Sequence, residues 1–165
     1  MKDGITITSD NLADVVKAIH QLTGTDLLVG IPQANTERRN DDNTSITNAE
    51  IGYIQETGSP AMNIPARPFL VPGVQGVEKP IAKQLEKGAR AALDGSRDDV
   101  EKAFIAAGLV AQNGVRRQVN DGMFAPLAEA TLAARRRRGR TGTKPLIDTG
   151  QLRNSITYVL RKKGK

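Results

Sequence analysis

The sequence predicts an α+β fold, in which several helices pack on a small, mostly antiparallel sheet within a single domain, residues 1–165. Two observations lead to this prediction. Several long stretches repeat apolar residues with the 3.6-residue period of an amphipathic helix, whereas two short stretches have the apolar run or the alternation of a strand. A chain of 165 residues also suggests one domain, and it is long enough to bury a core without disulfides.

The helices are predicted from apolar spacing and from capping residues at their starts. Ser9 or Asp10 can cap the first helix. Thr47 and Glu50 form a capping box for the second, and Ser96 caps the fourth. The predicted helices cover residues 9–24, 47–60, 78–93 and 97–120, and a fifth starts at Pro126 and runs into the arginines at 135–138.

Two strands are predicted. Residues 26–32 are a short apolar run that ends at a proline, and apolar residues alternate with others from Ile156 to Leu160. Segments near 3–8 and flanking residues 33–47 are further candidates for the sheet.

Three segments are predicted to be irregular. Residues 33–47 are rich in Asn, Asp and Arg and are predicted to form a mobile polar loop, and the basic residues 161–165 a frayed tail. Three prolines lie within residues 61–73, which predicts an extended, rigid segment without helix.

Composition excludes several classes of site. The chain has no cysteine and a single histidine, His20, so we expect no disulfide, no metal site and no histidine-based catalysis. It has no apolar run long enough to cross a membrane, and residues 1–10 do not resemble a signal peptide. We therefore expect a protein made in the cytoplasm, with no cofactor, no membrane partner and no small-molecule substrate.

Charge is distributed unevenly along the chain. Residues 1–130 contain 13 Lys and Arg against 17 Asp and Glu, a net of −4, whereas residues 131–165 contain 11 against 1, a net of +10. The basic character therefore belongs to the C-terminal fifth of the chain, and the functional question is what this segment contacts.

The triplet Asp148-Thr149-Gly150 follows two apolar residues, as does the catalytic aspartate of aspartic proteases. Such an enzyme needs two carboxylates that share a site, and substantial sheet after the aspartate to build the pocket. Only 15 residues follow Gly150, so we expect no catalysis. Asp148 and Gln151 instead have the spacing of a weak capping box, which predicts that residues 148–151 cap a short helix.

Three stretches resemble the tail-completion, or neck, proteins of long-tailed bacteriophages, a family also called virion morphogenesis proteins. They are AEIGYIQETGSPAMNIPARPFL (49–70), MFAPLAEATLAARRRRG (123–139) and KPLIDTGQLRNSITYVL (144–160). Their order and spacing agree with the family along most of residues 47–160. Phe124 is a departure, since tryptophan is commoner at that position.

The resemblance implies a structural, non-enzymatic virion protein. Such proteins work as rings, usually six-fold, at the junction between the DNA-filled head and the tail, where they contact neighbouring connector and tail proteins and surround the genome DNA. A closed ring requires one patch of each subunit to meet a different patch of the next. Tail terminator, head-closure and scaffold roles in the same virion remain open.

The candidate ring interface is the proline-rich segment, because a pre-ordered segment loses little entropy on docking. Arg67 and Phe69 are the candidate anchors, beside Pro68 and Leu70. The alternative is that Phe69 and Leu70 only attach the segment to the core of their own chain. The polar loop 33–47 can become ordered against the next ring, or simply be solvated.

The arginine cluster is the candidate contact for a partner or for the DNA backbone. It comprises Arg135, Arg136, Arg137, Arg138 and Arg140. These residues can bind phosphates, they can meet an acidic face of a neighbouring ring, or they can simply form a solvated charged end of a helix. We favour the neighbour, because a strongly basic lumen slows DNA transit. The competing hypothesis from another class is a non-specific DNA-binding protein that uses the C-terminal segment.

Overall fold

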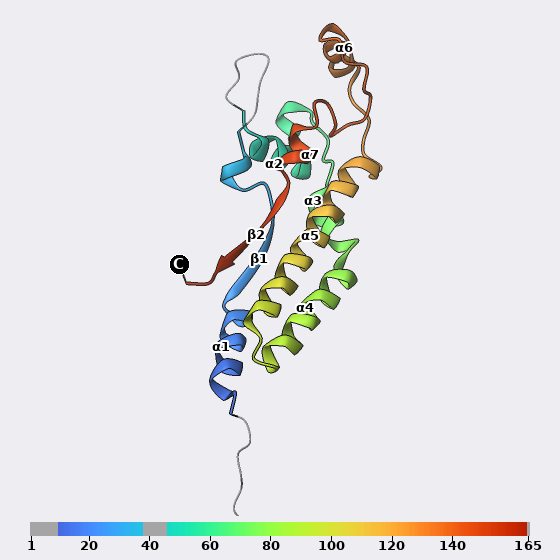
Figure 1. Cartoon of the computed structure of the whole chain (residues 1–165). Helices are drawn as coiled ribbons and strands as arrows, with labels where there is room; N and C mark the ends of the chain where they lie inside the picture. Colours follow the sequence, from blue (N-terminus) through green and yellow to red (C-terminus); the bar gives the residue numbers. More distant parts are fainter. Residues whose placement is uncertain (1–9, 38–45, 165) are drawn as a thin grey trace, which may run out of the picture.

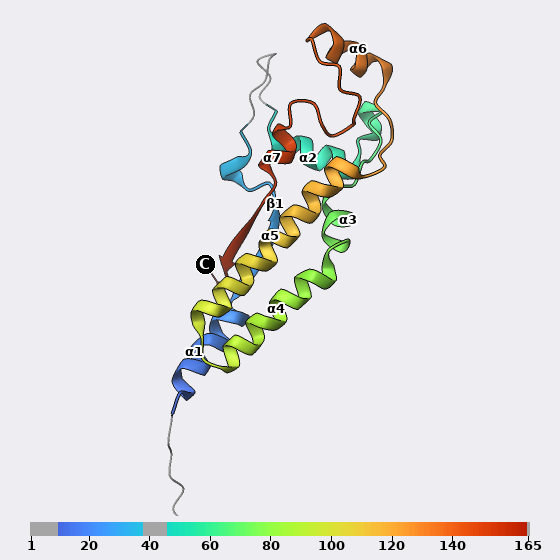
Figure 2. The same cartoon turned by 45° about the vertical axis from the view of Figure 1, so that its right-hand side comes forward.

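The computed structural model describes residues 10–37 and 46–164, and these contain seven α-helices, two short 3-10 helices and one two-stranded antiparallel sheet. The predicted α+β class is confirmed. The molecule is elongated, with α1 (Leu12–Thr23) near one end and α6 (Glu129–Arg137) at the other (Figures 1 and 2). The 3-10 helices are η1 (Gln33–Asn35) and η2 (Pro60–Met62).

The sheet brings the beginning and the end of the described chain together. β1 (Thr25–Gly30) pairs antiparallel with β2 (Thr157–Lys162), and Leu27 lies opposite Leu160. These two leucines pack on the helical core, while their neighbours Leu28 and Val159 are exposed on the other face. Both predicted strands are present, whereas the candidate strand near 3–8 lies outside the described residues.

The long helix α5 (Arg97–Asp121) is the centre of the fold and packs along α4 (Glu78–Leu93). Ser96 caps it as predicted, since its hydroxyl accepts the backbone N–H of Asp99. The core forms two clusters along this helix. The first contains Ala18, Ala92, Val100 and Phe104, and the second contains Phe69, Val115, Val119 and Ile156.

Helix α2 (Asn48–Thr57) begins with the predicted capping box. The Thr47 hydroxyl accepts the Glu50 backbone N–H, and the Glu50 carboxylate accepts the Thr47 backbone N–H at 2.8 Å. That backbone hydrogen bond, followed by the one from the Thr47 hydroxyl, lowers the pKa of Glu50 from its ordinary value. The short helix α7 (Gln151–Ser155) packs against α2.

Helix α1 buries less of its apolar stripe than its spacing predicts. Ala18 is fully buried, but Leu12, Val16 and Ile19 are exposed. Ser9 lies outside the described residues. Asp10 accepts the Leu12 N–H at 3.1 Å, while Asn11 is the N-cap and makes no side-chain bond to the helix. The exposed stripe is therefore an apolar surface that residues 10–37 and 46–164 leave uncovered.

Two predictions about helices are wrong. Residues 70–75 form a helix, α3 (Leu70–Gln75), despite Pro72, because Pro72 lies in the first turn, where an N–H has no partner in the helix. The helix predicted from Pro126 starts only at Glu129. The reason is tertiary: the carbonyl oxygens of Ala125 and Pro126 accept hydrogen bonds from Arg67, which keeps this stretch extended.

The predicted loop and tail are more ordered than expected where they are described. Residues 33–37 form η1 and then bond to α2, where Thr36 O accepts the Asn48 N–H at 2.8 Å. Residues 38–45 lie outside the described part. In the tail, β2 extends to Lys162, and Arg161 pairs with Asp26 at 3.1 Å. Strand pairing and the ion pairs of Arg161 and Lys163 with Asp26 attach the basic end to the fold as far as Lys163. Lys165 is not described.

Close packing of α3 on α5 depends on Gly73. A Cβ at this position would lie 2.6 Å from the Val115 Cα, a backbone atom that cannot move aside. We therefore expect Gly73→Ala to destabilise the protein by about 2 kcal/mol through overpacking, as measured by urea unfolding. Gly142→Ala is the matched control, because nothing lies within 4 Å of its Cβ position. Equal stability of the two variants would contradict this packing.

Candidate functional site

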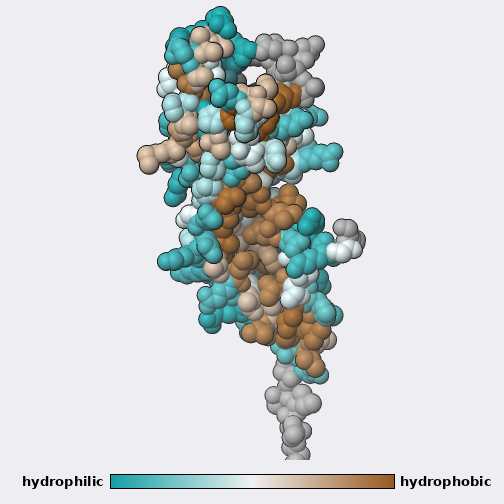
Figure 3. Space-filling view, turned by 180° about the vertical axis from the view of Figure 1, so that it is seen from behind, coloured by the Kyte–Doolittle hydropathy of each residue, from teal (hydrophilic) through white to brown (hydrophobic). Residues whose placement is uncertain are grey.

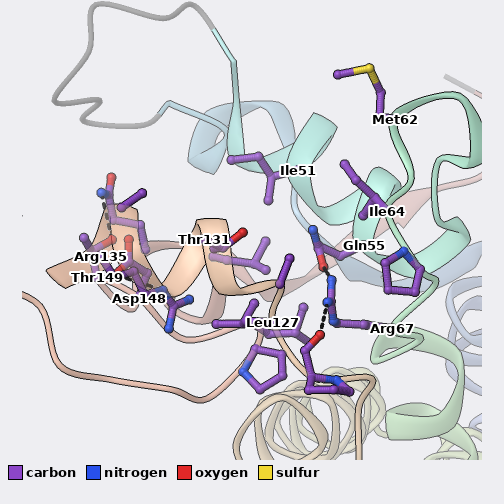
Figure 4. Close-up of a pocket in the computed structure, with 18 of the residues that line it drawn as sticks. Ile51, Gln55, Met62, Ile64, Arg67, Leu127, Thr131, Arg135, Asp148 and Thr149 are labelled. Atoms are coloured by element: carbon purple, nitrogen blue, oxygen red, sulfur yellow. Dashed lines mark hydrogen bonds and ion pairs between the residues drawn. The ribbon is translucent and has the colours of Figure 1, made fainter. Parts of the chain in front are cut away.

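The candidate site is a cavity of about 660 Å³ at the α6 end of the molecule. It lies between α2 and the η2 loop on one side, and α6 and the segment leading to α7 on the other (Figure 4). Its lining joins parts of all three stretches that carry the family resemblance. Polar residues of the lining include Gln55, Arg67, Thr131, Arg135, Arg138 and Asp148.

Asp148 attaches the basic segment to the body of the protein. Its Oδ2 lies 2.9 Å from Arg140 Nη1, and its Oδ1 lies 3.5 Å from Arg135 Nε. Arg135 Nη1 also donates to the carbonyl oxygens of Gly142 at 2.8 Å and Lys144 at 2.9 Å. These contacts fold residues 129–144, which we call the arginine arm, back toward α7.

The predicted short helix is present as α7 and its N-cap lies within residues 148–151, but the prediction that the Asp148 side chain caps it is wrong. The N-cap of α7 is Gly150, with φ 79°, and no side chain caps this helix. Asp148 bonds to arginines instead, because two nearby guanidinium groups attract a carboxylate more strongly than a neutral N–H does. Gln151 Nε2 donates to Thr149 Oγ1 at 3.0 Å.

The same contacts bear on the aspartic-protease hypothesis. A protease dyad requires two carboxylates sharing one site. Asp148 is the only carboxylate among the described residues that line the cavity, and both of its oxygens face arginines. Within one chain, the Asp-Thr-Gly triplet is thus an ion-pair partner rather than half of a dyad.

The predicted interface anchors Arg67 and Phe69 are wrong as surface residues, because both side chains are buried, at 5% and 2% exposure. Phe69 belongs to the second core cluster, against which Leu70 also packs, and this is the alternative that the sequence left open. Pro68 is exposed. Only Pro68 of this group keeps the surface position that an interface requires.

Arg67 is an internal crosslink. Its Nε and Nη2 donate to Ala125 O at 2.8 Å and Pro126 O at 2.9 Å, and its Nη1 donates to Gln55 Oε1 at 3.0 Å (Figure 4). Burial lowers the pKa of Arg67 from its ordinary value, but a guanidinium stays charged. Its role is to join α2 to the segment that leads into the arginine arm.

The arginine cluster is divided by its surroundings. Arg135 is buried and Arg140 is half-buried beside Asp148, so neither is an open contact for a partner. Arg136, Arg137 and Arg138 are exposed, and Arg136 pairs with Glu129 on the same helix. The prediction of a five-arginine contact surface is therefore corrected to these three residues.

Glu56 is a key residue that sequence reasoning did not single out for a role. Its carboxylate accepts three successive backbone N–H groups, from Phe69 at 2.7 Å, Leu70 at 2.8 Å and Val71 at 3.1 Å. These belong to the start of α3, where a negative charge also meets the positive end of the helix dipole. No capping pattern predicts this bond, because the residues are at least 13 positions apart in the chain.

Comparisons with protein families, with curated proteins and with solved structures give no match for this chain. No helix in the described ranges has the length and apolar character to cross a membrane. Among residues 10–37 and 46–164, no group of three or more His, Asp or Glu side chains is arranged to hold a metal ion.

Proposed function

We propose that this protein is a structural subunit of a phage head–tail junction. It forms part of a ring that completes the tail or neck and allows heads to join, and the expected symmetry of this ring is six-fold. The resemblance of three ordered stretches to tail-completion proteins supports this proposal. The single observation that carries it furthest is the arginine arm. Arg67 holds the segment that leads into the arm, Asp148 pairs with Arg135 and Arg140 within it, and three exposed arginines lie at one end of an elongated body.

The charge distribution fits contacts between unlike surfaces. The exposed arginines belong to a segment of net +10, whereas residues 1–130 carry −4. Subunits stacked or ringed head to tail can bring the arm of one molecule against the acidic body of another. Such complementarity raises the association rate and fixes orientation more than it raises affinity. We therefore favour a neighbouring virion protein over DNA as the partner of the arm.

The decisive test is electron microscopy of lysates from the encoding phage or prophage after inactivation of this gene. Filled heads beside unjoined or abnormal tails are the expected result. Tail length then separates a tail terminator from a neck or head-closure protein. Normal, infectious virions would refute the proposal.

Neutralising the exposed arginines should block joining without unfolding the subunit. The variant Arg136→Gln, Arg137→Gln, Arg138→Gln leaves Arg135 and its ion pair with Asp148 intact. We expect heads and tails to remain separate in lysates that contain this variant. The matched control is Lys79→Gln, Lys83→Gln, Lys87→Gln, which removes the same charge from exposed positions on α4. Normal joining with altered DNA ejection would instead place the arginines in the lumen.

Non-specific DNA binding is the second candidate, and the exposure of Arg136, Arg137 and Arg138 is the observation that favours it. Each phosphate contact contributes about −0.9 to the slope of log affinity against log salt. If this candidate is correct, the isolated chain binds duplex DNA, and neutralising the three arginines reduces the slope by about 2 to 3. No retention on duplex DNA at low salt would exclude it.

A further inference from the structure

An apolar groove runs along the face opposite to that seen in Figure 1. Figure 3 shows it as a hydrophobic band down the middle of the molecule. One wall is β1, with Leu27 and Val29, and the other is formed by α3 and α4, with α5 as the floor. The helical walls and floor contribute Val74, Ile81, Leu85, Ala89, Phe104 and Ala111. The cavity measures about 520 Å³, and its wall residues are only half-buried.

The groove also exposes an unpaired strand edge. In the described part of the chain β1 is hydrogen-bonded on one side only, to β2, so its other edge faces α4 across the groove. The backbone N–H and C=O groups of such an edge form a ready template for another strand. A sheet of two strands also has fewer strands than a stable sheet usually has. The groove thus combines backbone donors and acceptors with apolar walls, which is the arrangement that binds an added strand.

The chain contains a segment suited to this groove. In Gly4-Ile5-Thr6-Ile7-Thr8, β-branched residues alternate apolar and polar with period two. As a strand, it places both isoleucines on one face and both threonines on the other. These residues lie outside the described ranges. We propose that residues 4–8 of a neighbouring copy of this chain pair with the free edge of β1 and insert Ile5 and Ile7 into the groove.

The length of chain before α1 points to a neighbour rather than to the same molecule. The C-terminal end of α1 borders the groove through Leu22, while its N-terminal end points away (Figures 1 and 2). Twelve helical residues span about 18 Å. Five extended residues separate Ile7 from Leu12 and reach at most about 18 Å. A segment that doubled back along its own α1 would therefore place Ile7 no further than the entrance of the groove and could seat only Ile5 inside it, whereas a segment from a neighbour can seat both isoleucines.

This inference adds a subunit contact to the proposed ring. It rests on the proposed function only in that the neighbouring copy is taken to be the next subunit of the ring. An exchanged strand between unlike surfaces generates a closed ring when the rotation closes. The exposed apolar residues Leu12, Val16 and Ile19 lie on α1, the helix whose Leu22 borders the groove, so the same neighbour is close enough to contact them.

The absence of cysteine allows a direct test with the purified full-length chain. An Ile7→Cys chain and an Ile81→Cys chain carrying a tag of different mass are mixed and oxidised. A mixed disulfide dimer is expected, because the Cα atoms of two bridged cysteines must approach within about 7 Å. Leu109→Cys replaces Ile81→Cys in the control, since Leu109 is an exposed apolar residue of α5 that does not line the groove. A mixed dimer formed equally with the control would overturn the proposal.

Two further variants test which face of the segment enters the groove. Ile5→Asp with Ile7→Asp should weaken self-association by about a hundredfold or more, because two buried isoleucines are lost. Thr6→Asp with Thr8→Asp adds the same charge to the outer face and should retain association. Sedimentation velocity measures both. Equal loss of self-association in the two charge variants would overturn the pairing. So would a chain that carries both Ile7→Cys and Ile81→Cys and forms the disulfide only within itself. Either failure leaves the lysate phenotype intact, so the two proposals fail separately.

Discussion

Replacing Glu56 with alanine should destabilise the protein by about 3 kcal/mol. Three hydrogen bonds to a charged group are lost, but the freed N–H groups are only partly buried, so water replaces part of each bond and the loss is smaller than the sum of the three. The N–H groups of Phe69, Leu70 and Val71 would lose their acceptor at the start of α3. With a urea slope of about 2 kcal/mol/M, the unfolding midpoint should fall by about 1.5 M.

The control for this variant is Glu86→Ala. Glu86 is also a helical glutamate, but it lies on the exposed face of α4 and pairs with Arg90 one turn later. Its loss should leave the urea midpoint close to that of the unchanged protein. Glu56→Gln keeps one oxygen acceptor and should fall between the two. If Glu56→Ala and Glu86→Ala had the same midpoint, Glu56 would not hold α3 in place.

Replacing Asp148 with alanine should release the arginine arm. Removing one partner of a buried ion pair leaves an uncompensated charge. The cost here is about 2–3 kcal/mol, below that of a fully buried pair, because Asp148 is only half-buried and Arg135 keeps its two carbonyl acceptors. We expect trypsin to cleave the variant within residues 135–144 much faster than the unchanged chain, since α6 packs little on other elements. Mass spectrometry of the early fragments locates the cut.

Asp121→Ala is the matched control, because Asp121 is an exposed aspartate at the end of α5. It should leave the rate and the position of tryptic cleavage unchanged. A double-mutant cycle of Asp148→Ala with Arg140→Ala should show coupling, given the 2.9 Å contact between these side chains. Additive effects in that cycle, together with unchanged cleavage of Asp148→Ala, would show that the arm is held by other contacts.

Local features of the fold follow from the sequence because their partners are close in the chain. Thr47 and Glu50 are three positions apart and form the predicted capping box, and Ser96 caps α5 by the same local geometry. The helical period likewise locates α4 and α5 to within a residue or two. Each of these depends on a single turn of backbone, which nearby residues specify on their own.

The candidate site is predicted less well from the sequence, because its side chains bond to residues that are far away along the chain. Arg67 has the composition of an interface anchor, but it binds carbonyl groups 58 and 59 positions later and is buried. Asp148 has the spacing of a cap, but two arginines compete for its carboxylate. Pro72 predicts a break, yet Glu56 supplies an acceptor for the N–H groups just before it and α3 begins there.

The sequence by itself determined the α+β class, the caps of α2 and α5 and the concentration of positive charge at the C-terminal end, since periodicity, capping and composition act locally. Only the tertiary structure decided which charges are exposed. A guanidinium can be buried only where the fold supplies hydrogen-bond acceptors for it. The fold supplies carbonyl acceptors to the buried Arg67 and Arg135, whereas Arg136 to Arg138 lie at the surface. The same packing separates β1 from α4 and opens the groove, because both elements rest on α5 instead of on each other.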